Sequence, residues 1–438
     1  MLKHLKAILF FLFLGLQVQG QSLYFPPLTG NTWDTLSPGA QGWCVQYIDS
    51  LYSYLDQNNT KAFILLKDGK IVLEKYFGTF TQDSAWYWAS AGKTLTAFAV
   101  GIAQQEGFLN IQDSSSKYLG PGWTIAPPQK EKLITVLDQL RMSSGLDDNV
   151  PDHYCTLDTC LKYLADAGTR WAYHNGPYTL LDAVIENATS MTLNQWISQK
   201  IKIPTGMTGA FFPSGFNNVF YSKARSMARF GLLLLNKGKW NSTPVLTDSN
   251  YFDAMTNTSQ TMNPSYGYLT WLNGKSSFLL PGTQFNFPGH LMPDAPADMF
   301  AALGKNGQLI NVVPSSRMVV IRMGDTPNGA EVSTLFNDTL WIKLKQIMCQ
   351  PNTLQSPGEE LFRFYPNPAT DVLQVHTNQN GLFELYNLVG KRIIVRSLES
   401  GVHRIDLVGI PNGHYQLIFK PSDHTKLRIA AQLNILHY

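Results

Sequence analysis

Two groups of strand-forming segments stand near opposite ends of residues 21–350, and a long helical stretch separates them. Ala62–Lys67 and Lys70–Phe77 flank Asp68-Gly69, which is the strongest short signal for a β-hairpin. Three apolar segments beyond the helical stretch also read as strands: Met299–Leu303, Gln308–Val313 and Met318–Met323. Strands at both ends of a helical insertion indicate one antiparallel sheet assembled from distant segments, which is an α+β arrangement.

Helical periodicity surrounds this predicted sheet. Val45–Leu55 has helical spacing before the first strand, and Val332–Ile347 reads as a helix after the last one. Residues 91–240 look mostly helical, including Leu133–Met142 and Ser226–Asn236. The sequence therefore predicts an antiparallel sheet flanked by terminal helices, with a large and mostly helical lobe inserted between its strands.

Composition narrows the class of protein. Aromatic residues reach 12% and charged residues only 15%, which excludes a disordered chain and a coiled coil. The 438 residues carry 34 basic and 31 acidic side chains, a net charge of +3, and no run of Lys and Arg appears. A nucleic-acid partner is therefore not expected.

Residues 1–20 have the pattern of a secretory signal peptide. Lys3 and Lys6 precede an apolar run from Ala7 to Leu16, and small residues precede the expected cleavage after Gly20. A membrane anchor is the weaker interpretation, because the apolar run is about half of the ~20 residues that a spanning helix needs. We expect an exported protein without a stable membrane span.

The four cysteines agree with export. Cys155 and Cys160 lie five positions apart, while Cys44 and Cys349 bracket almost the whole central region. An even count in an exported chain favours disulfides, and of the three pairings we expect Cys155–Cys160 and Cys44–Cys349. Four free buried thiols are the alternative. No metal site is expected, because no Cys-x-x-Cys or His-x-His spacing accompanies these residues.

The chain changes character near residue 350. Residues 351–360 are rich in Pro, Asn and Gly and read as a linker. Residues 361–438 then alternate short strands with turns, which predicts a small β-sandwich that is too small for a deep active site. The expected strands are Val372–Val375, Leu382–Tyr386, Arg392–Val395, Ile405–Leu407 and Tyr415–Phe419.

The start of this tail, Phe364-Tyr365-Pro366-Asn367-Pro368-Ala369-Thr370-Asp371, resembles the C-terminal sorting domain of proteins exported by the type IX secretion system of Bacteroidetes. Glu384-Leu385-Tyr386-Asn387 fits the same pattern. The resemblance implies the type IX machinery as a partner and export across the outer membrane. It also implies that the tail is either removed or used for attachment at the cell surface. A generic sugar- or protein-binding module is the alternative.

The chemistry is expected at Ser90-Ala91-Gly92-Lys93, which opens an apolar helix. A spacing of three places Ser90 and Lys93 on one face of the first turn. Burial lowers the pKa of a lysine, and a neutral amine can then take the proton of the hydroxyl. Ser114-Ser115-Ser116-Lys117 repeats the spacing, but it lies in a polar run and reads as a solvated helix start or turn.

Two further motifs follow the Ser-x-x-Lys pattern along the chain. Tyr173-His174-Asn175 precedes a helical segment, and Gly304-Lys305-Asn306-Gly307-Gln308 lies in the last strand region. Alone, the first motif would be interpreted as a tyrosine packed in a turn, and the second as a plain tight turn. Their order after Ser-x-x-Lys is hard to obtain by chance.

With these three motifs, residues 22–350 resemble the serine hydrolases of the β-lactamase/penicillin-binding superfamily. The nearest branch holds class C β-lactamases, D-Ala-D-Ala carboxypeptidases, related esterases and 6-aminohexanoate-dimer hydrolases. The resemblance implies Ser90 as the acylated nucleophile, Lys93 as its base partner and Tyr173 as the acid/base for the leaving group. It implies that Asn175 hydrogen-bonds the lysine or the substrate amide. Non-catalytic stretches also agree, namely Phe25-Pro26-Pro27, residues 139–148 and residues 228–234.

The third motif departs from the family's Lys-Thr-Gly in one of two ways. Lys305-Asn306-Gly307 matches it by composition, whereas Ala302-Leu303-Gly304 occupies its place when counted back from the following strand. We prefer the second register. Lys305 would then supply an oxyanion-hole N–H beside that of Ser90. This register lacks the positive group that anchors a β-lactam carboxylate, so amide or ester cleavage is the safer expectation.

The motifs that other hydrolytic or cofactor-dependent mechanisms require are missing from the sequence. The sequence has no Gly-x-Ser-x-Gly elbow, no His-Glu-x-x-His and no dinucleotide or phosphate loop, so no cofactor is expected. His153, His174 and His290 read as surface or pocket-wall residues.

The sequence therefore predicts a secreted serine hydrolase that cleaves amide, peptide or ester bonds in a small-molecule or peptide-like substrate. The alternative is a non-catalytic, penicillin-recognising-type binding protein at the cell surface.

Overall fold

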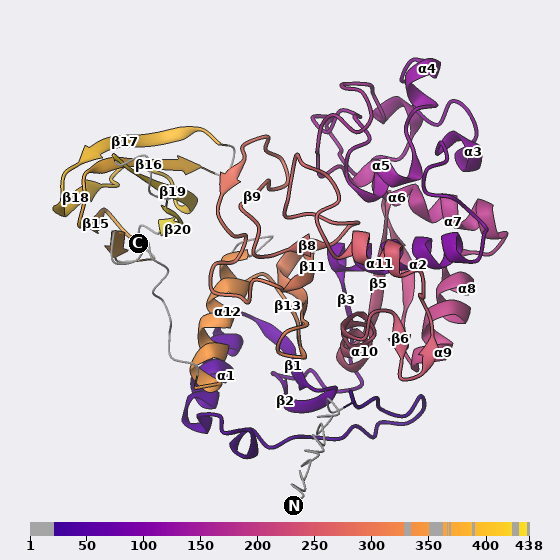
Figure 1. Cartoon of the computed structure of the whole chain (residues 1–438), viewed down its shortest axis with the longest axis horizontal. Helices are drawn as coiled ribbons and strands as arrows, with labels where there is room; N and C mark the ends of the chain where they lie inside the picture. The colour runs from indigo at the N-terminus through magenta and orange to yellow at the C-terminus, as the bar shows by residue number, and fades with distance from the viewer. Residues whose placement is uncertain are drawn as a thin grey trace, which may run out of the picture.

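The computed structural model describes residues 22–327, 334–349, 362–365, 367, 369–387, 390–422 and 429–435. Its centre is an antiparallel sheet in the order β2-β1-β13-β12-β11-β8 (Figure 1). These strands are β1 (Thr60–Lys67), β2 (Lys70–Tyr76), β8 (Trp271–Leu272), β11 (Phe300–Gly304), β12 (Gln308–Val313) and β13 (Met318–Gly324). The predicted sheet of distant segments is confirmed, since β1 pairs directly with β13.

The β1–β2 hairpin forms where the sequence predicts it. Asp68 and Gly69 both have positive φ, 54° and 83°, as a two-residue hairpin turn requires. A Cβ on Gly69 would lie 2.0 Å from the carbonyl oxygen of Tyr24, so the N-terminal segment can cross this turn only over a glycine.

Helices stand on both sides of the sheet. α1 (Ile48–Gln57) and α12 (Thr334–Ile347) pack against each other on one side, and α10 (Ala224–Leu235) packs on β12 and β13 from the other (Figure 1). A Cβ on Gly231 of α10 would lie 2.4 Å from the Val319 side chain, so the helix lies very close to the sheet. All residues of β12 and β13 are buried, as expected for strands covered on both faces.

Both predicted disulfides are confirmed. Cys44, just before the first helices, is bonded to Cys349, just after α12, with their Cα atoms 5.4 Å apart. This bond ties together the two ends of the domain. Cys155 is bonded to Cys160 within one loop of the helical lobe.

The lobe between the strand groups is mostly helical, as predicted. Its α-helices are α2 (Gly92–Gln105), α3 (Ser116–Leu119), α4 (Pro128–Glu131), α5 (Val136–Leu140), α6 (Asn175–Thr179), α7 (Leu181–Thr189), α8 (Leu193–Ile197), α9 (Ile203–Thr205), α10 and α11 (Ser249–Met255). Short turns of other helix types are η1 (Gly39–Gln41), η2 (Val45–Tyr47), η3 (Ala89–Ala91), η4 (Asp158–Cys160), η5 (Ser198–Lys202) and η6 (Lys305–Gly307).

Two details of the lobe differ from the prediction. A sheet of β3 (Ala85–Tyr87), β5 (Asn217–Lys223) and β4 (Ala210–Ser214) lies inside it. Its β4–β5 turn has Gly215 at φ 60° but no Asn-Gly or Asp-Gly pair, so the hairpin signal is weak. The predicted helix Leu133–Met142 shortens to α5, because Thr135 caps its start and Met142, at φ 59°, ends it. Two-residue strands β6 (Lys239–Trp240), β7 (Thr243–Pro244), β9 (Ser277–Phe278) and β10 (Phe287–Pro288) complete the region.

The C-terminal region is a two-sheet sandwich around its own apolar core, as predicted. One sheet is β14 (Phe362–Tyr365), β15 (Val372–Thr377) and β18 (Gly401–Asp406); the other is β17 (Arg392–Leu398), β16 (Gly381–Asn387), β19 (Gly413–Pro421) and β20 (Ile429–Ile435). The sandwich lies beside the loops around β9 (Figure 1), where the rings of Tyr386 and Phe285 are 4.9 Å apart.

The expected signal peptide, residues 1–20, and the expected linker, residues 351–360, lie outside the described residues. Among the residues that are described, none of the helices combines the length and the apolar character needed to cross a bilayer.

Candidate active site

Ser90 sits where the three-stranded sheet meets the first buried helix. It is the second residue of η3, which continues directly into α2. Trp88, just before η3, is buried; its indole donates to the Ser222 hydroxyl at 2.8 Å and its backbone N–H to Phe220 O. Ala89 adopts φ 46°, a strained left-handed conformation for a residue with a Cβ. This fixed turn presents Ser90 at the N-terminal, electropositive end of a buried helix.

Lys93 lies one turn further along this helix and is only 2% exposed. Burial lowers the pKa of its amine to about 7, and the charge of Asp182 partly opposes that shift. The Nζ atom lies 3.8 Å from the centre of the Tyr178 ring and 5.5 Å from that of Tyr173. A large fraction of this amine is therefore neutral near pH 7 and able to accept a proton.

Tyr173 comes to the same place from the loop before α6. Its hydroxyl hydrogen-bonds with Ser90. Burial raises the pKa of Tyr173, and the bond to Ser90 partly offsets that effect. Its ring stacks on Trp271 of β8 with a centroid separation of 6.0 Å, so the phenol is held between the lobe and the sheet. The serine, the lysine and the tyrosine thus meet within one cluster.

These residues border a cavity of about 290 Å³. Of the site residues predicted from sequence, Ser90, Tyr173, Asn175 and Lys305 line it directly. Lys93 lies beneath it, in contact with the Tyr173 and Tyr178 rings. The remaining lining residues are Asp148, His153, Tyr154, Trp271, Pro281, Gly282 and Leu303.

The end of β11 forms the wall opposite the lobe. Ala302, Leu303 and Gly304 lie in the strand, and Lys305 begins the η6 turn after it. A Cβ on Gly304 would lie 2.4 Å from Trp88 O and 3.0 Å from Ala91 N. The strand therefore contacts the backbone around Ser90 so closely that only glycine fits. Which of the two registers replaces the family's third motif stays a prediction.

A disulfide-bonded loop forms the polar wall. His153 and Tyr154 come just before Cys155, which the bond to Cys160 fixes. The backbone of this loop also contacts the start of α6, because Gly176 N–H donates to His153 O at 2.9 Å. A Cβ on Gly176 would lie 2.4 Å from Cys155 O. Deeper in this wall, Asp148 pairs with Arg170 at 2.6 Å.

Several polar groups near the site are buried without a hydrogen-bond partner. They include the Asn175 Oδ1 atom, both ring nitrogens of His174 and Asp182 Oδ1. Burial lowers the pKa of His174 to about 4 and raises that of Asp182 to about 7. Perturbed titratable groups next to a cavity are typical of functional sites.

Other sequence candidates lie elsewhere. Lys117 of the second Ser-x-x-Lys copy is exposed and pairs with Asp113 at 2.6 Å, as expected for a solvated helix start. His290 does not line the cavity, and His174 is a buried neighbour of it. Residues 150–160 and 258–295 supply lining residues of the cavity, whereas residues 210–222 supply none. The sequence predicts no site role for Asp148, which ends the stretch 139–148, or for Trp271, which belongs to no motif.

The chain thus combines a serine at the start of a buried helix with an antiparallel sheet whose last strands lie beside it. The chain belongs to the Beta-lactamase family, whose sequence model matches residues 55–333. The model of the secretion system C-terminal sorting domain matches residues 363–429. This type IX sorting domain supports secretion and export to the cell surface.

Curated relatives are distant. An uncharacterized protein of Alkalihalophilus pseudofirmus is 24% identical over 61% of this chain and 84% of its own length. The protein named flp of Staphylococcus aureus is 26% identical, but the match covers 36% of this chain and only 35% of flp.

Solved structures share the fold at low identity. A candidate 6-aminohexanoate-dimer hydrolase from Bacillus anthracis has a TM-score of 0.58 and 18% identity, covering 76% of this chain and 92% of that one. A penicillin-binding protein homologue from Caulobacter crescentus has a TM-score of 0.53 and 14% identity, covering 70% and 98%. At these identities, the similarities show that the fold is shared.

Proposed function

We propose that this protein is a secreted serine hydrolase that cleaves amide, peptide or ester bonds through an acyl-enzyme on Ser90. One observation carries the proposal. The Ser90 hydroxyl borders the cavity and is hydrogen-bonded to Tyr173, beside a buried lysine whose pKa lies at about 7. A hydroxyl that is hydrogen-bonded to a tyrosine beside a neutral amine can pass on its proton as it attacks, which covalent hydrolysis needs.

Acylation uses Ser90 and its two partners. Ser90 Oγ attacks the carbonyl carbon of the substrate while its proton passes to the Tyr173–Lys93 pair. The backbone N–H groups of Ser90 and Lys305 hold the resulting oxyanion. The C–N or C–O bond then breaks, Tyr173 gives the leaving group a proton, and an ester on Ser90 remains.

Deacylation reverses these proton transfers. A water molecule attacks the ester carbonyl and gives one proton to the Tyr173–Lys93 pair. The same two N–H groups hold the second oxyanion. Ser90 Oγ then leaves and regains a proton, which releases the carboxylic acid product and restores the site.

Asn175 has the position to orient one of these groups. Its side chain lines the cavity, and its buried Oδ1 atom accepts no hydrogen bond from the residues that the structure describes. A buried carbonyl without a donor is unfavourable, so a bound substrate amide or a shift of the lysine would satisfy it. We assign Asn175 to hydrogen bonding with the substrate amide or with Lys93.

The wall next to the nucleophile favours simple amides and esters over β-lactams. In the preferred register, apolar Ala302 and Leu303 take the places of the family's Lys and Thr, so those two positions would offer no anchor for a β-lactam carboxylate. We therefore expect turnover of activated esters or amides and little hydrolysis of a chromogenic cephalosporin.

Labelling with a fluorescent fluorophosphonate tests the proposal. Wild type should gain one adduct, located on Ser90 by peptide mass spectrometry, and Ser90→Ala should gain none. Wild type should also hydrolyse an activated ester. If it shows neither a Ser90-dependent adduct nor turnover, the enzyme proposal is wrong and the alternative of a non-catalytic binding protein at the cell surface remains. A panel of ester, amide and D-peptide substrates then identifies the substrate class.

A further inference from the structure

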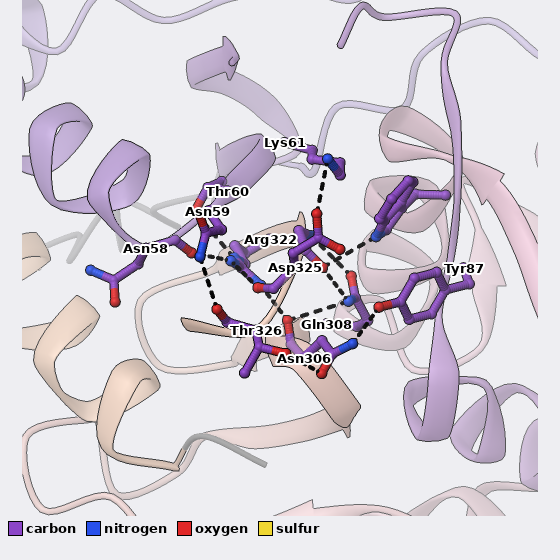
Figure 2. Close-up of polar contacts among 12 residues, drawn as sticks. Asn58, Asn59, Thr60, Lys61, Tyr87, Asn306, Gln308, Arg322, Asp325 and Thr326 are labelled. Atoms are coloured by element: carbon purple, nitrogen blue, oxygen red, sulfur yellow. Dashed lines mark hydrogen bonds and ion pairs between the residues drawn. The ribbon is translucent and has the colours of Figure 1, made fainter. Parts of the chain in front are cut away.

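The η6 turn that begins with Lys305 rests on a buried arginine. Arg322, on the neighbouring strand β13, is 0% exposed. Its Nη1 atom donates to the Asn306 carbonyl at 2.5 Å (Figure 2). The same atom donates to the Gly307 carbonyl at 3.0 Å. A Cβ on Gly307 would lie 2.7 Å from this same nitrogen, so the turn and the guanidinium are in direct contact.

The other Arg322 donors reach the distant segment around Asn58 and Thr60 and the carbonyl three residues further on. Nη2 donates to Asn58 O at 2.6 Å and to Asp325 O at 2.9 Å, and Nε donates to the Thr60 hydroxyl at 3.1 Å. No carboxylate within the described residues forms an ion pair with Arg322. Burying an unpaired guanidinium is costly, and burial lowers its pKa to about 9. Its role is therefore to satisfy four carbonyls of three converging segments.

The side chain of Asn306 links this turn to the segment that carries the nucleophile. Asn306 Nδ2 donates to the Tyr87 hydroxyl at 2.6 Å, and Asn306 Oδ1 accepts from the Thr326 hydroxyl at 2.6 Å (Figure 2). Tyr87 ends β3, three residues before Ser90. Asn306 itself has φ 63°, a left-handed conformation that asparagine tolerates better than most residues. One side chain thus joins the two backbone segments that meet at the site.

We infer that Asn306 is a positioning residue for the oxyanion hole. Arg322 holds the backbone carbonyl of Asn306, and the Asn306 side chain is bonded to Tyr87. Together these bonds fix the backbone N–H of Lys305 relative to that of Ser90. The inference rests on the proposed function, because it concerns the two N–H groups assigned to the oxyanion. Neither Asn306 nor Arg322 lines the cavity, so both act through the backbone that they hold.

The expected effect is on the reaction step rather than on substrate binding. A donor displaced by about 1 Å at a reacting centre can lower the rate about 100-fold. We expect Asn306→Gly, which keeps the left-handed backbone but removes both side-chain bonds, to lower kcat about 10- to 100-fold with a much smaller change in KM. Tyr87→Phe, which removes only the link to β3, should lower kcat about 3- to 10-fold.

Asn241→Gly is the matched control, because exposed Asn241 also has positive φ, 54°, in the β6–β7 turn, and does not line the cavity. Three quantities are measured on the full chain: kcat and KM with an activated ester, the affinity of a boronic acid, and Tm. A boronic acid bonded to Ser90 places an oxygen in the oxyanion hole, so its affinity should fall in parallel with kcat for Asn306→Gly. A merely structural role would lower Tm without this parallel loss.

The outcomes separate the inference from the proposed function. If wild type labels on Ser90 while Asn306→Gly and Tyr87→Phe keep the kcat and boronate affinity of the Asn241→Gly control, only the positioning role is wrong. If Asn306→Gly does not fold, Tyr87→Phe decides alone, because it keeps the ring and the turn. If wild type neither labels nor turns over ester, the proposed function is wrong and the inference is wrong with it.

Discussion

Two segments of this chain carry a serine and a lysine three residues apart, and they have opposite properties. Lys93 is 2% exposed and burial lowers its pKa to about 7. The side chain of Lys117 is 60% exposed, and its hydrogen bond with Asp113 raises its pKa. The spacing is identical in the two segments. The depth at which the fold places the helix decides whether the amine can serve as a base.

The difference arises from the helices that hold the two motifs. α2 is buried from Gly92 to Ala103 and lies between the sheet and the lobe. α3 has four residues and none of them is buried. Sequence spacing brings hydroxyl and amine to one face in both helices. Only a helix enclosed on all sides desolvates the amine enough to change its protonation at neutral pH.

The strongest test replaces the two serines. Ser90→Ala should abolish labelling and lower ester turnover about 10³-fold or more, because no other group in the proposed mechanism can form the acyl bond. Ser114→Ala should label and turn over ester like wild type. The measurement is the rate of probe attachment together with ester hydrolysis at one pH. Equal loss in both variants would show that the two motifs do not differ in function.

Replacing the two lysines is the next test. Lys93→Met removes the base but keeps an apolar side chain of similar length, so kcat should fall about 10²- to 10⁴-fold. Removing a desolvated amine should also raise Tm by about 2–5 °C. Lys117→Met should change neither quantity appreciably, because its ion pair is exposed to solvent. Activity and thermal unfolding of the same preparations check both parts, and a lower Tm for Lys93→Met would contradict them.

The pH dependence gives a finer measure of the same contrast. Lys93 must be neutral to act as a base, so kcat/KM should rise with pH through about 7 and then level off.

The lowered pKa of Lys93 also makes the free energy of unfolding depend on pH. Between pH 7 and the ordinary lysine pKa of 10.5, the unfolded chain binds the Lys93 proton and the folded chain does not, so this group makes folding more favourable as pH rises.

The Tm advantage of Lys93→Met over wild type should therefore be greatest below pH 7 and should shrink toward pH 10. Lys117→Met against wild type serves as the control over the same range. An advantage that stays constant with pH would mean that Lys93 keeps its ordinary pKa in the folded protein.

Much of this contrast could be predicted from sequence, because it depends on local spacing and apolar pattern. The central sheet, the terminal helices and both disulfides followed from hairpin, periodicity and cysteine signals. The β3-β5-β4 sheet could not be predicted, since its turn at Gly215 lacks a hairpin dipeptide. Asp148 and Trp271 reach the cavity from a loop and a two-residue strand whose positions depend on tertiary packing. The Asn306–Tyr87 bond joins residues 219 positions apart, and no local pattern specifies such a contact.

The smallest expected effect is a shift of the kcat/KM pH profile when the carboxylate near each lysine is neutralised. The charge of Asp182 raises the pKa of Lys93 and so opposes its desolvation. Asp182→Asn keeps the shape and can still bond to Asn218, which donates to Asp182 Oδ2 at 3.1 Å. The variant should lower the pKa of Lys93 further and move the acidic limb of the kcat/KM profile to lower pH, with little change in the plateau. Asp113→Asn, beside exposed Lys117, should leave the profile unchanged. A shift of the limb to higher pH in Asp182→Asn would mean that Asp182 does not stabilise the charged lysine.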